Sequence, residues 1–138
     1  MTTSDHPFAS YPSLVDRTVF VTGGADGIGS AIVRNFARQG SKVAFVDKNA
    51  EYARRTIDAC VADGAPHAPL FYEVDLVDVD ALRVACDAAV RDLGGVTVLV
   101  NNAASDDRHD WRDMTPEYFD DRMHVNLRHY FFAIQALA

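Results

Sequence analysis

The sequence predicts an α/β fold built on a doubly wound parallel sheet. Short runs rich in β-branched residues alternate with longer stretches whose apolar residues recur every three or four positions. A glycine-rich turn separates the first such run from the first helical stretch. Because crossovers between parallel strands are right-handed, four successive strands of this kind are expected in the order 3-2-1-4.

Each expected element follows from this alternation. Strands are expected over residues 18–22, 42–46, 70–74 and 96–100. Helices are expected over 28–39, 50–63 and 78–93, and a long helical stretch opens at Thr115-Pro116-Glu117 and runs to the end of the chain. Glycines end the first three helices, namely Gly40, Gly64 and the pair Gly94-Gly95. The residues expected to face inward from the first and third helices are Ile28, Ile32, Phe36, Leu82, Ala85, Ala89 and Leu93.

The fourth strand is expected at an edge of the sheet. Residues 96–100 are apolar apart from Thr97, which is typical of a strand covered on both faces. Natural proteins avoid leaving a long apolar edge open. We therefore expect a fifth strand, absent from these 138 residues, to cover it. On this view the sheet is truncated after the helix that follows strand four.

Composition narrows the class of protein. The chain is expected to form one domain over residues 17–138, preceded by an N-terminal arm over 1–16. A net charge of −7 argues against a nucleic-acid partner, and apolar runs of only about five residues argue against a membrane span. The N-terminus carries no positive leader, and Cys60 and Cys86 lie outside any motif, so a reduced, cytoplasmic protein without a signal peptide is expected. Scattered histidines predict no metal site.

The glycine-rich turn predicts a phosphate-binding loop. Gly23, Gly27 and Gly29 lie between a strand and a helix, where a pyrophosphate has to approach the backbone closely. The helix that follows offers free N–H groups and a partial positive charge. The alternative, an ordinary glycine-rich turn, does not account for the strand, the helix and the alternation that follow.

Asp47 predicts which dinucleotide is bound. It ends the second strand, where a carboxylate can accept hydrogen bonds from both hydroxyls of the adenosine ribose. The same charge repels a 2′-phosphate, and Asp26 in the glycine loop adds to the repulsion. NAD is therefore favoured over NADP, although Lys48 weakens the argument. The alternative is that Asp47 is only a turn residue.

Other polar residues are expected at the same edge of the sheet. Asp75 ends the third strand before Leu76, where it could bind the adenine amino group or could equally be the N-cap of the next helix. Asn101 and Asn102 end the fourth strand and either approach the cofactor or form a turn. Asn126 lies within a helical pattern that it does not favour, which indicates a local distortion or a water contact.

Taken together these residues resemble the short-chain dehydrogenases/reductases, from Leu14 to the end of the chain. The matching pieces are Thr22-Gly23-x-x-x-Gly27-Ile28-Gly29, Asp47, Asp75, Asn101-Asn102-Ala103-Ala104 and Asn126. The family usually has a glycine where Ala104 stands, so space near the cofactor is slightly tighter here. The resemblance implies a Rossmann-type fold. It also implies NAD contacts by Gly23, Asp26, Gly27, Ile28, Gly29, Asp47, Lys48, Asp75, Leu76, Asn102 and Ala103.

Three segments are similar to one branch of that family. They are Tyr11-Pro12-Ser13-Leu14, Asn102-Ala103-x-x-Asp106-Asp107-Arg108-His109 and Asn126-Leu127-Arg128-His129. The branch is the NAD-dependent aldose 1-dehydrogenases of the D-xylose and L-arabinose type, which oxidise a sugar to a lactone. This resemblance implies a small sugar or alcohol as substrate. From composition alone, residues 105–113 are a solvated charged loop.

The family's catalytic groups are only partly present. The resemblance implies that Asn126 is the catalytic asparagine, which holds a water for proton relay. A serine on the fifth strand and a Tyr-x-x-x-Lys are missing, since the only lysines are Lys42 and Lys48. We therefore expect a fragment that is inactive alone; the alternative is a non-catalytic nucleotide-binding or interaction module. In the family, helices corresponding to 116–138 pair between subunits, so a homo-oligomer is expected.

Overall fold

The computed structural model describes residues 9–138. Its sheet has four parallel strands in the order β3-β2-β1-β4, as the sequence predicts. The strands are β1 (Thr18–Thr22), β2 (Lys42–Asp47), β3 (Leu70–Glu73) and β4 (Val98–Asn101). β1 and β2 are central and almost wholly buried, while β4 is half-buried at an edge. All four strands end at the same edge of the sheet.

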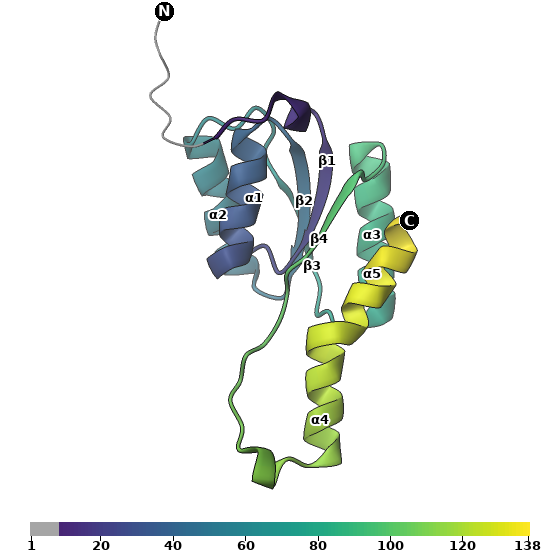
Figure 1. Cartoon of the computed structure of the whole chain (residues 1–138). Helices are drawn as coiled ribbons and strands as arrows, with labels where there is room; N and C mark the ends of the chain where they lie inside the picture. The colour runs from purple at the N-terminus through teal and green to yellow at the C-terminus, as the bar shows by residue number, and fades with distance from the viewer. Residues whose placement is uncertain (1–8) are drawn as a thin grey trace, which may run out of the picture.

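Helices cover both faces of the sheet (Figure 1). α1 (Gly27–Arg38) and α2 (Ala50–Ala62) lie on one face, and α3 (Val79–Leu93) and α5 (His129–Leu137) on the other. α4 (Pro116–Met123) projects beyond the carboxyl ends of the strands, and a π-helical turn, η3 (His124–Arg128), joins it to α5. Two short 3-10 turns complete the chain, η1 (Pro12–Leu14) and η2 (Trp111–Asp113).

Two apolar clusters, one on each face, hold the layers together. Phe45 anchors the cluster under α1 and α2, and Phe20 the cluster under α3 and α5; neither side chain is exposed to solvent. Burying side chains of this size stabilises the fold by roughly 2–3 kcal/mol each. The sheet is thereby held rigid behind the edge where its strands end.

The helix faces were predicted with one error. Leu82, Ala85 and Ala89 are buried as expected, and Leu93 packs against them. Ile28, however, is 76% exposed. It belongs to the first turn of α1 and does not pack against the core beneath that helix. The buried residues of α1 are Gly29, Val33 and Ala37, with Ile32 and Phe36 partly buried beside them.

Two elements differ from expectation by more than one residue at a boundary. β4 is assigned from Val98 rather than from residue 96, because the turn after α3 extends through Gly95, which has a φ of +120°. The helical stretch after Thr115 is interrupted by η3, so it forms three segments instead of one. The interruption contains Asn126, where the sequence indicates a distortion, and that prediction is confirmed.

The expected arm is partly described. Residues 1–8 lie outside the described part of the chain, while residues 9–16 pack beside the turn between α1 and β2. Ser41 Oγ donates to the carbonyl of Leu14 at 2.7 Å, and Asp16 N donates to the carbonyl of Gly40 at 2.9 Å. Within residues 9–138, no helix combines the length and apolarity that crossing a bilayer requires.

Candidate functional site

A cavity of about 890 Å³ opens where the strands end. Its walls come from the glycine loop after β1, from the ends of β2, β3 and β4, and from α4 and η3. Every residue expected to bind the cofactor lines it. Beyond these, the lining includes Val74, Val77, Ala104, Ser105, Asp106, Asp121, Arg122 and Val125. A volume of this size is suited to a ligand of cofactor dimensions.

Two glycines in the loop serve different purposes. A Cβ on Gly29 would lie 1.7 Å from the carbonyl oxygen of Gly23, so the loop can close only around a glycine. A Cβ on Gly27 would meet no atom within 4 Å, yet Gly27 has a φ of +54° and lines the cavity. Gly27 thus leaves open the space in which a ligand can approach the backbone.

The start of α1 fits an anionic ligand. Asp26 is the N-cap residue by its extended backbone, but its side chain makes no capping hydrogen bond. The N–H groups of the first turn are therefore not capped by that carboxylate, and they face the cavity with the positive end of the helix dipole. Because these N–H groups are free to bind an anion, the start of α1 fits a pyrophosphate group.

Asp47 is held in a fixed orientation at the end of β2. One carboxylate oxygen accepts a hydrogen bond from Ala25 N at 3.1 Å, and the other accepts from Asn49 N at 3.0 Å. The half-buried carboxylate lines the cavity beside exposed Lys48 and Asp26. Each oxygen keeps lone pairs that can accept a ligand hydroxyl. Asp47 is the last residue of β2 and bonds to the turn that follows, but it also presents its charge to the ligand space.

Asp75 is not the N-cap of α3. The N-cap is Asp78, whose side chain accepts from Ala81 N at 3.0 Å. The carboxylate of Asp75 instead accepts from Val77 N at 3.1 Å and lines the cavity together with Leu76. The N-cap alternative is therefore wrong, and Asp75 lies in the cavity wall after the end of β3.

Asn102 links the ends of β4 and β1. Its side-chain amide donates to the carbonyls of Thr22 and Gly23, at 3.1 and 3.0 Å. Thr22 Oγ1 in return accepts from Asn102 N at 3.0 Å and from Ala103 N at 3.2 Å. Asn102 therefore bridges two strand ends, while Asn101 still belongs to β4. These bonds place Ala103 in the wall of the cavity.

Asn126 holds the loop that follows β4. Its Oδ1 accepts from Ser105 N at 2.7 Å, and its Nδ2 donates to the carbonyl of Ser105 at 3.1 Å. Its neighbour Val125 lines the cavity, whereas Asn126 stands behind the loop. The amide is thus occupied by the protein backbone, which is a positioning contact.

Sequence reasoning assigned no role to three side chains that shape this wall. In the sequence, Thr22 is only the last residue of an apolar run, although a polar residue at the end of a strand is a usable signal of a site residue. Arg122 reads as a charge on an exposed helix, but its guanidinium donates to Ser105 Oγ at 2.8 Å and to Asp107 at 3.3 Å. His129 is fully buried behind Ala103, with its Nε2 3.0 Å from the Ala103 carbonyl oxygen.

Comparison with known proteins agrees with this geometry. A family model described as short chain dehydrogenase matches residues 17–138. The chain is 51% identical over 132 residues to "Probable galactose dehydrogenase GalD" of Rhizobium meliloti, covering 96% of this chain and 51% of that protein. It is 44% identical over 130 residues to D-xylose 1-dehydrogenase of Caulobacter vibrioides, covering 94% and 50%.

A solved structure indicates the same family. The short-chain dehydrogenase/reductase from Serratia marcescens superposes with a TM-score of 0.85 at 33% identity, covering 92% of this chain and 51% of that one. The chain spans about half the length of the curated relatives it matches. This chain belongs to the short-chain dehydrogenase family.

Proposed function

We propose that this chain forms the cofactor-binding part of an NAD-dependent sugar 1-dehydrogenase of the cytoplasm that produces a lactone. The observation that carries the proposal is the carboxylate of Asp47, which is oriented toward the cavity by two backbone N–H groups. Relatives named as galactose and D-xylose dehydrogenases support a sugar as the substrate class. The family as a whole uses a nicotinamide cofactor.

The cofactor choice follows from charge. Asp47 can accept hydrogen bonds from the two ribose hydroxyls of NAD, and such charge-assisted bonds contribute about 1.5–3 kcal/mol each. A 2′-phosphate at the same place would meet this carboxylate and that of Asp26 at the lip of the cavity. Lys48 is the one lysine in the lining, and it is exposed to solvent, which weakens its pull on a phosphate.

The remaining residues of the site would hold the cofactor and orient the substrate. The glycine loop and the start of α1 would hold the pyrophosphate, Asp75 and Leu76 the adenine, and Asn102 with Ala103 the nicotinamide ribose. A bound nicotinamide would supply the hydride acceptor for oxidation at the anomeric carbon of the substrate. Residues 104–106, in the loop that Asn126 and Arg122 hold, would form the wall on the substrate side.

The proton that leaves the substrate needs a base from outside these 138 residues. No tyrosine in the sequence is followed by a lysine four positions later. The parent enzyme would therefore supply its general base from a further segment. The same cavity would also serve a non-catalytic nucleotide-binding module, which shares the cofactor contacts and differs in lacking turnover.

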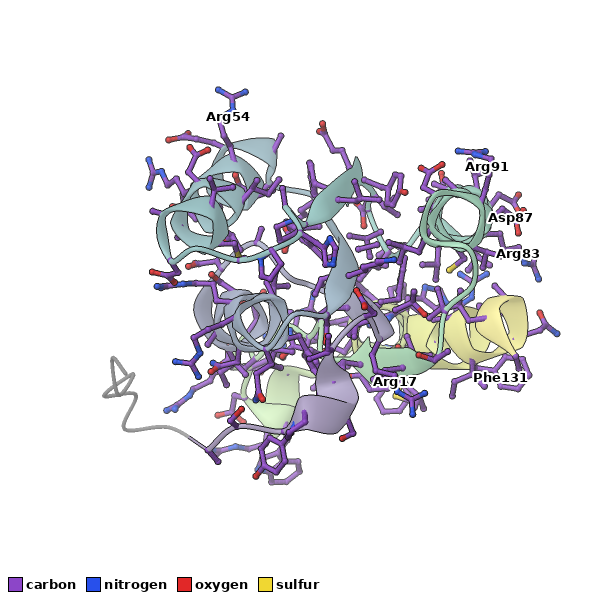
Figure 2. The ribbon with its side chains drawn as sticks, turned by 90° about the horizontal axis from the view of Figure 1, so that it is seen from above. Arg17, Arg54, Arg83, Asp87, Arg91 and Phe131 are labelled. Atoms are coloured by element: carbon purple, nitrogen blue, oxygen red, sulfur yellow. The ribbon has the colours of Figure 1, made fainter. Side chains whose placement is uncertain are left out.

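We further propose that α4 and α5 meet a second copy of this chain. Five large apolar side chains on this surface are more than a third exposed, namely Phe119, Met123, Leu127, Phe131 and Ile134. Figure 2 shows Phe131 directed away from the sheet. Apolar residues gathered in this way are typical of a protein interface.

Isothermal titration of the chain with NAD and with NADP tests the cofactor assignment. We expect the chain to bind NAD more tightly than NADP. Asp47→Ala should weaken the affinity for NAD by about tenfold or more, and it should reduce the difference in affinity between NAD and NADP. Asp87→Ala removes the same charge from the outer surface of α3 (Figure 2), so it should leave both affinities unchanged. Native preference for NADP, or equal effects of the two substitutions, would refute the proposal.

A further inference from the structure

His129 is a buried polar residue that the cofactor contacts do not use. It lies at the start of α5 and has no solvent exposure. Its Nε2 stands 3.0 Å from the carbonyl oxygen of Ala103, and its ring meets that of Tyr130 edge to face, with centroids 4.5 Å apart. Burying an imidazole is costly unless it is hydrogen-bonded, so this contact has to offset that cost.

The residue it contacts lies at the junction of two loops. Ala103 packs so closely on the glycine loop that a Cβ on Gly23 would lie 2.8 Å from both its Cα and its Cβ. Ala103 N is already held by Thr22 Oγ1. The peptide groups on both sides of Ala103 are therefore held, one by β1 and the other by α5.

The π-helical turn places two side chains on this loop together. Asn126 belongs to η3 and binds both polar atoms of the Ser105 backbone. His129, three positions later, reaches Ala103 two residues earlier in the loop. The two side chains therefore hold neighbouring peptide groups of one loop.

We propose that His129 is a positioning residue, which donates a hydrogen bond from Nε2 to the Ala103 carbonyl and thereby fixes the loop 102–105 against the glycine loop. The part of this proposal that concerns cofactor affinity rests on the proposed function, whereas the part that concerns loop order does not. Burial lowers the pKa of His129, against the opposing effect of the backbone at Ala103 and Val125, which favours the neutral ring in the folded protein. A neutral ring with its proton on Nε2 is the form that makes this bond.

Replacement by residues of different reach separates positioning from simple core packing. His129→Gln keeps an amide donor at about the reach of Nε2, His129→Asn keeps a donor that is too short, and His129→Leu has none. Val33→Ala is the matched control, because it opens a cavity under α1, on the opposite face of the sheet from His129. A purely structural histidine would affect the loop no more than that control does.

Amide hydrogen exchange on the 138-residue chain measures the loop directly. The readout is the exchange of Ala103 and Ser105 relative to Phe45 in β2. We expect His129→Leu and His129→Asn to raise this ratio about tenfold, as loss of one buried hydrogen bond would, and His129→Gln to stay within about threefold of the wild type. Val33→Ala should not raise this ratio, because any loosening it causes falls on the cluster that contains the reference residue Phe45. If His129→Leu does not fold, the exchange ratios of His129→Gln and His129→Asn, compared with each other, decide whether His129 positions the loop.

Titration with NADH supplies the second measurement. We expect the dissociation constant to follow the exchange ratio, rising about tenfold in the Leu and Asn variants and recovering in Gln. An unchanged exchange ratio in the Leu and Asn variants, or equal loosening in Gln, would overturn the role of His129. If the wild-type chain did not bind NADH, the proposed function would fail, while the exchange data would still decide the positioning role.

Discussion

Gly29→Ala should destabilise the fold strongly, whereas Gly27→Ala should destabilise it only slightly and act mainly on ligand binding. A methyl group on Gly29 would stand 1.7 Å from the carbonyl oxygen of Gly23 and 2.6 Å from Asn102 Nδ2. To restore a contact of 3.4 Å, that carbonyl has to move by about 1.7 Å. The movement breaks the hydrogen bond that Asn102 donates to Gly23 and strains the bond from Gly23 N to the Val46 carbonyl.

The magnitude follows from these contacts. Two hydrogen bonds at about 1 kcal/mol each and an overpacking cost of about 1–3 kcal/mol give a loss of roughly 3–5 kcal/mol in the free energy of unfolding. Gly27→Ala meets no neighbouring atom, so its cost is the left-handed backbone alone, about 1–2 kcal/mol. Its methyl group nevertheless lies at the cavity wall, where it would obstruct a pyrophosphate.

Urea unfolding followed by far-UV circular dichroism measures both variants. Fluorescence is a poor choice, because the single tryptophan, Trp111, is 78% exposed and changes its environment little on unfolding. At equal slope, the midpoint of Gly29→Ala should fall well below that of Gly27→Ala, and only the latter should remain folded yet fail to bind NADH. A Gly29→Ala protein within about 0.5 kcal/mol of the wild type would refute the steric reasoning.

Three other outcomes are expected. Because the pKa of His129 is lowered from 6.5, the unfolded chain binds the proton more readily, so stability should fall as the pH drops below that value, and His129→Gln should flatten the dependence of the urea midpoint on pH. Thr22→Val leaves the N–H groups of Asn102 and Ala103 without their acceptor, and it should lower the free energy of unfolding by about 2–3 kcal/mol in the same assay. Phe131→Ser should reduce self-association in sedimentation velocity; association equal to that of the wild type would place the interface elsewhere.

Much of the fold could be predicted because its signals are local. Alternating short and long segments indicate strands and helices, and the handedness of crossovers then leaves one order for the sheet. Because parallel strands bring their ends to one edge, residues that the resemblance named after different strands line one cavity. The exposure of Ile28 was missed because periodicity identifies a helix face but not which residues of that face line a cavity instead of the core.

The hydrogen bonds that shape the site could not be predicted in the same way. Thr22 acts through Asn102, 80 residues later in the chain, and the contact exists only because β1 pairs with β4 in one register. His129 follows the π-helical turn η3 directly and contacts Ala103, 26 residues earlier in the chain. Asn126 indicated a distortion there, but nothing in the spacing indicated which later side chain the distortion would turn toward the loop.

These contacts join the glycine loop and the loop after β4 into one unit. The absence of a side chain at Gly29 allows the Gly23 carbonyl to take its position, and Asn102 donates to that same carbonyl. Ala103 packs on Gly23 and is held from behind by His129. Neither loop can therefore shift alone. A ligand that orders the glycine loop should also protect the amides at the other end of the cavity, and coupling of this kind lets the adenosine half of a dinucleotide set the geometry around its nicotinamide half.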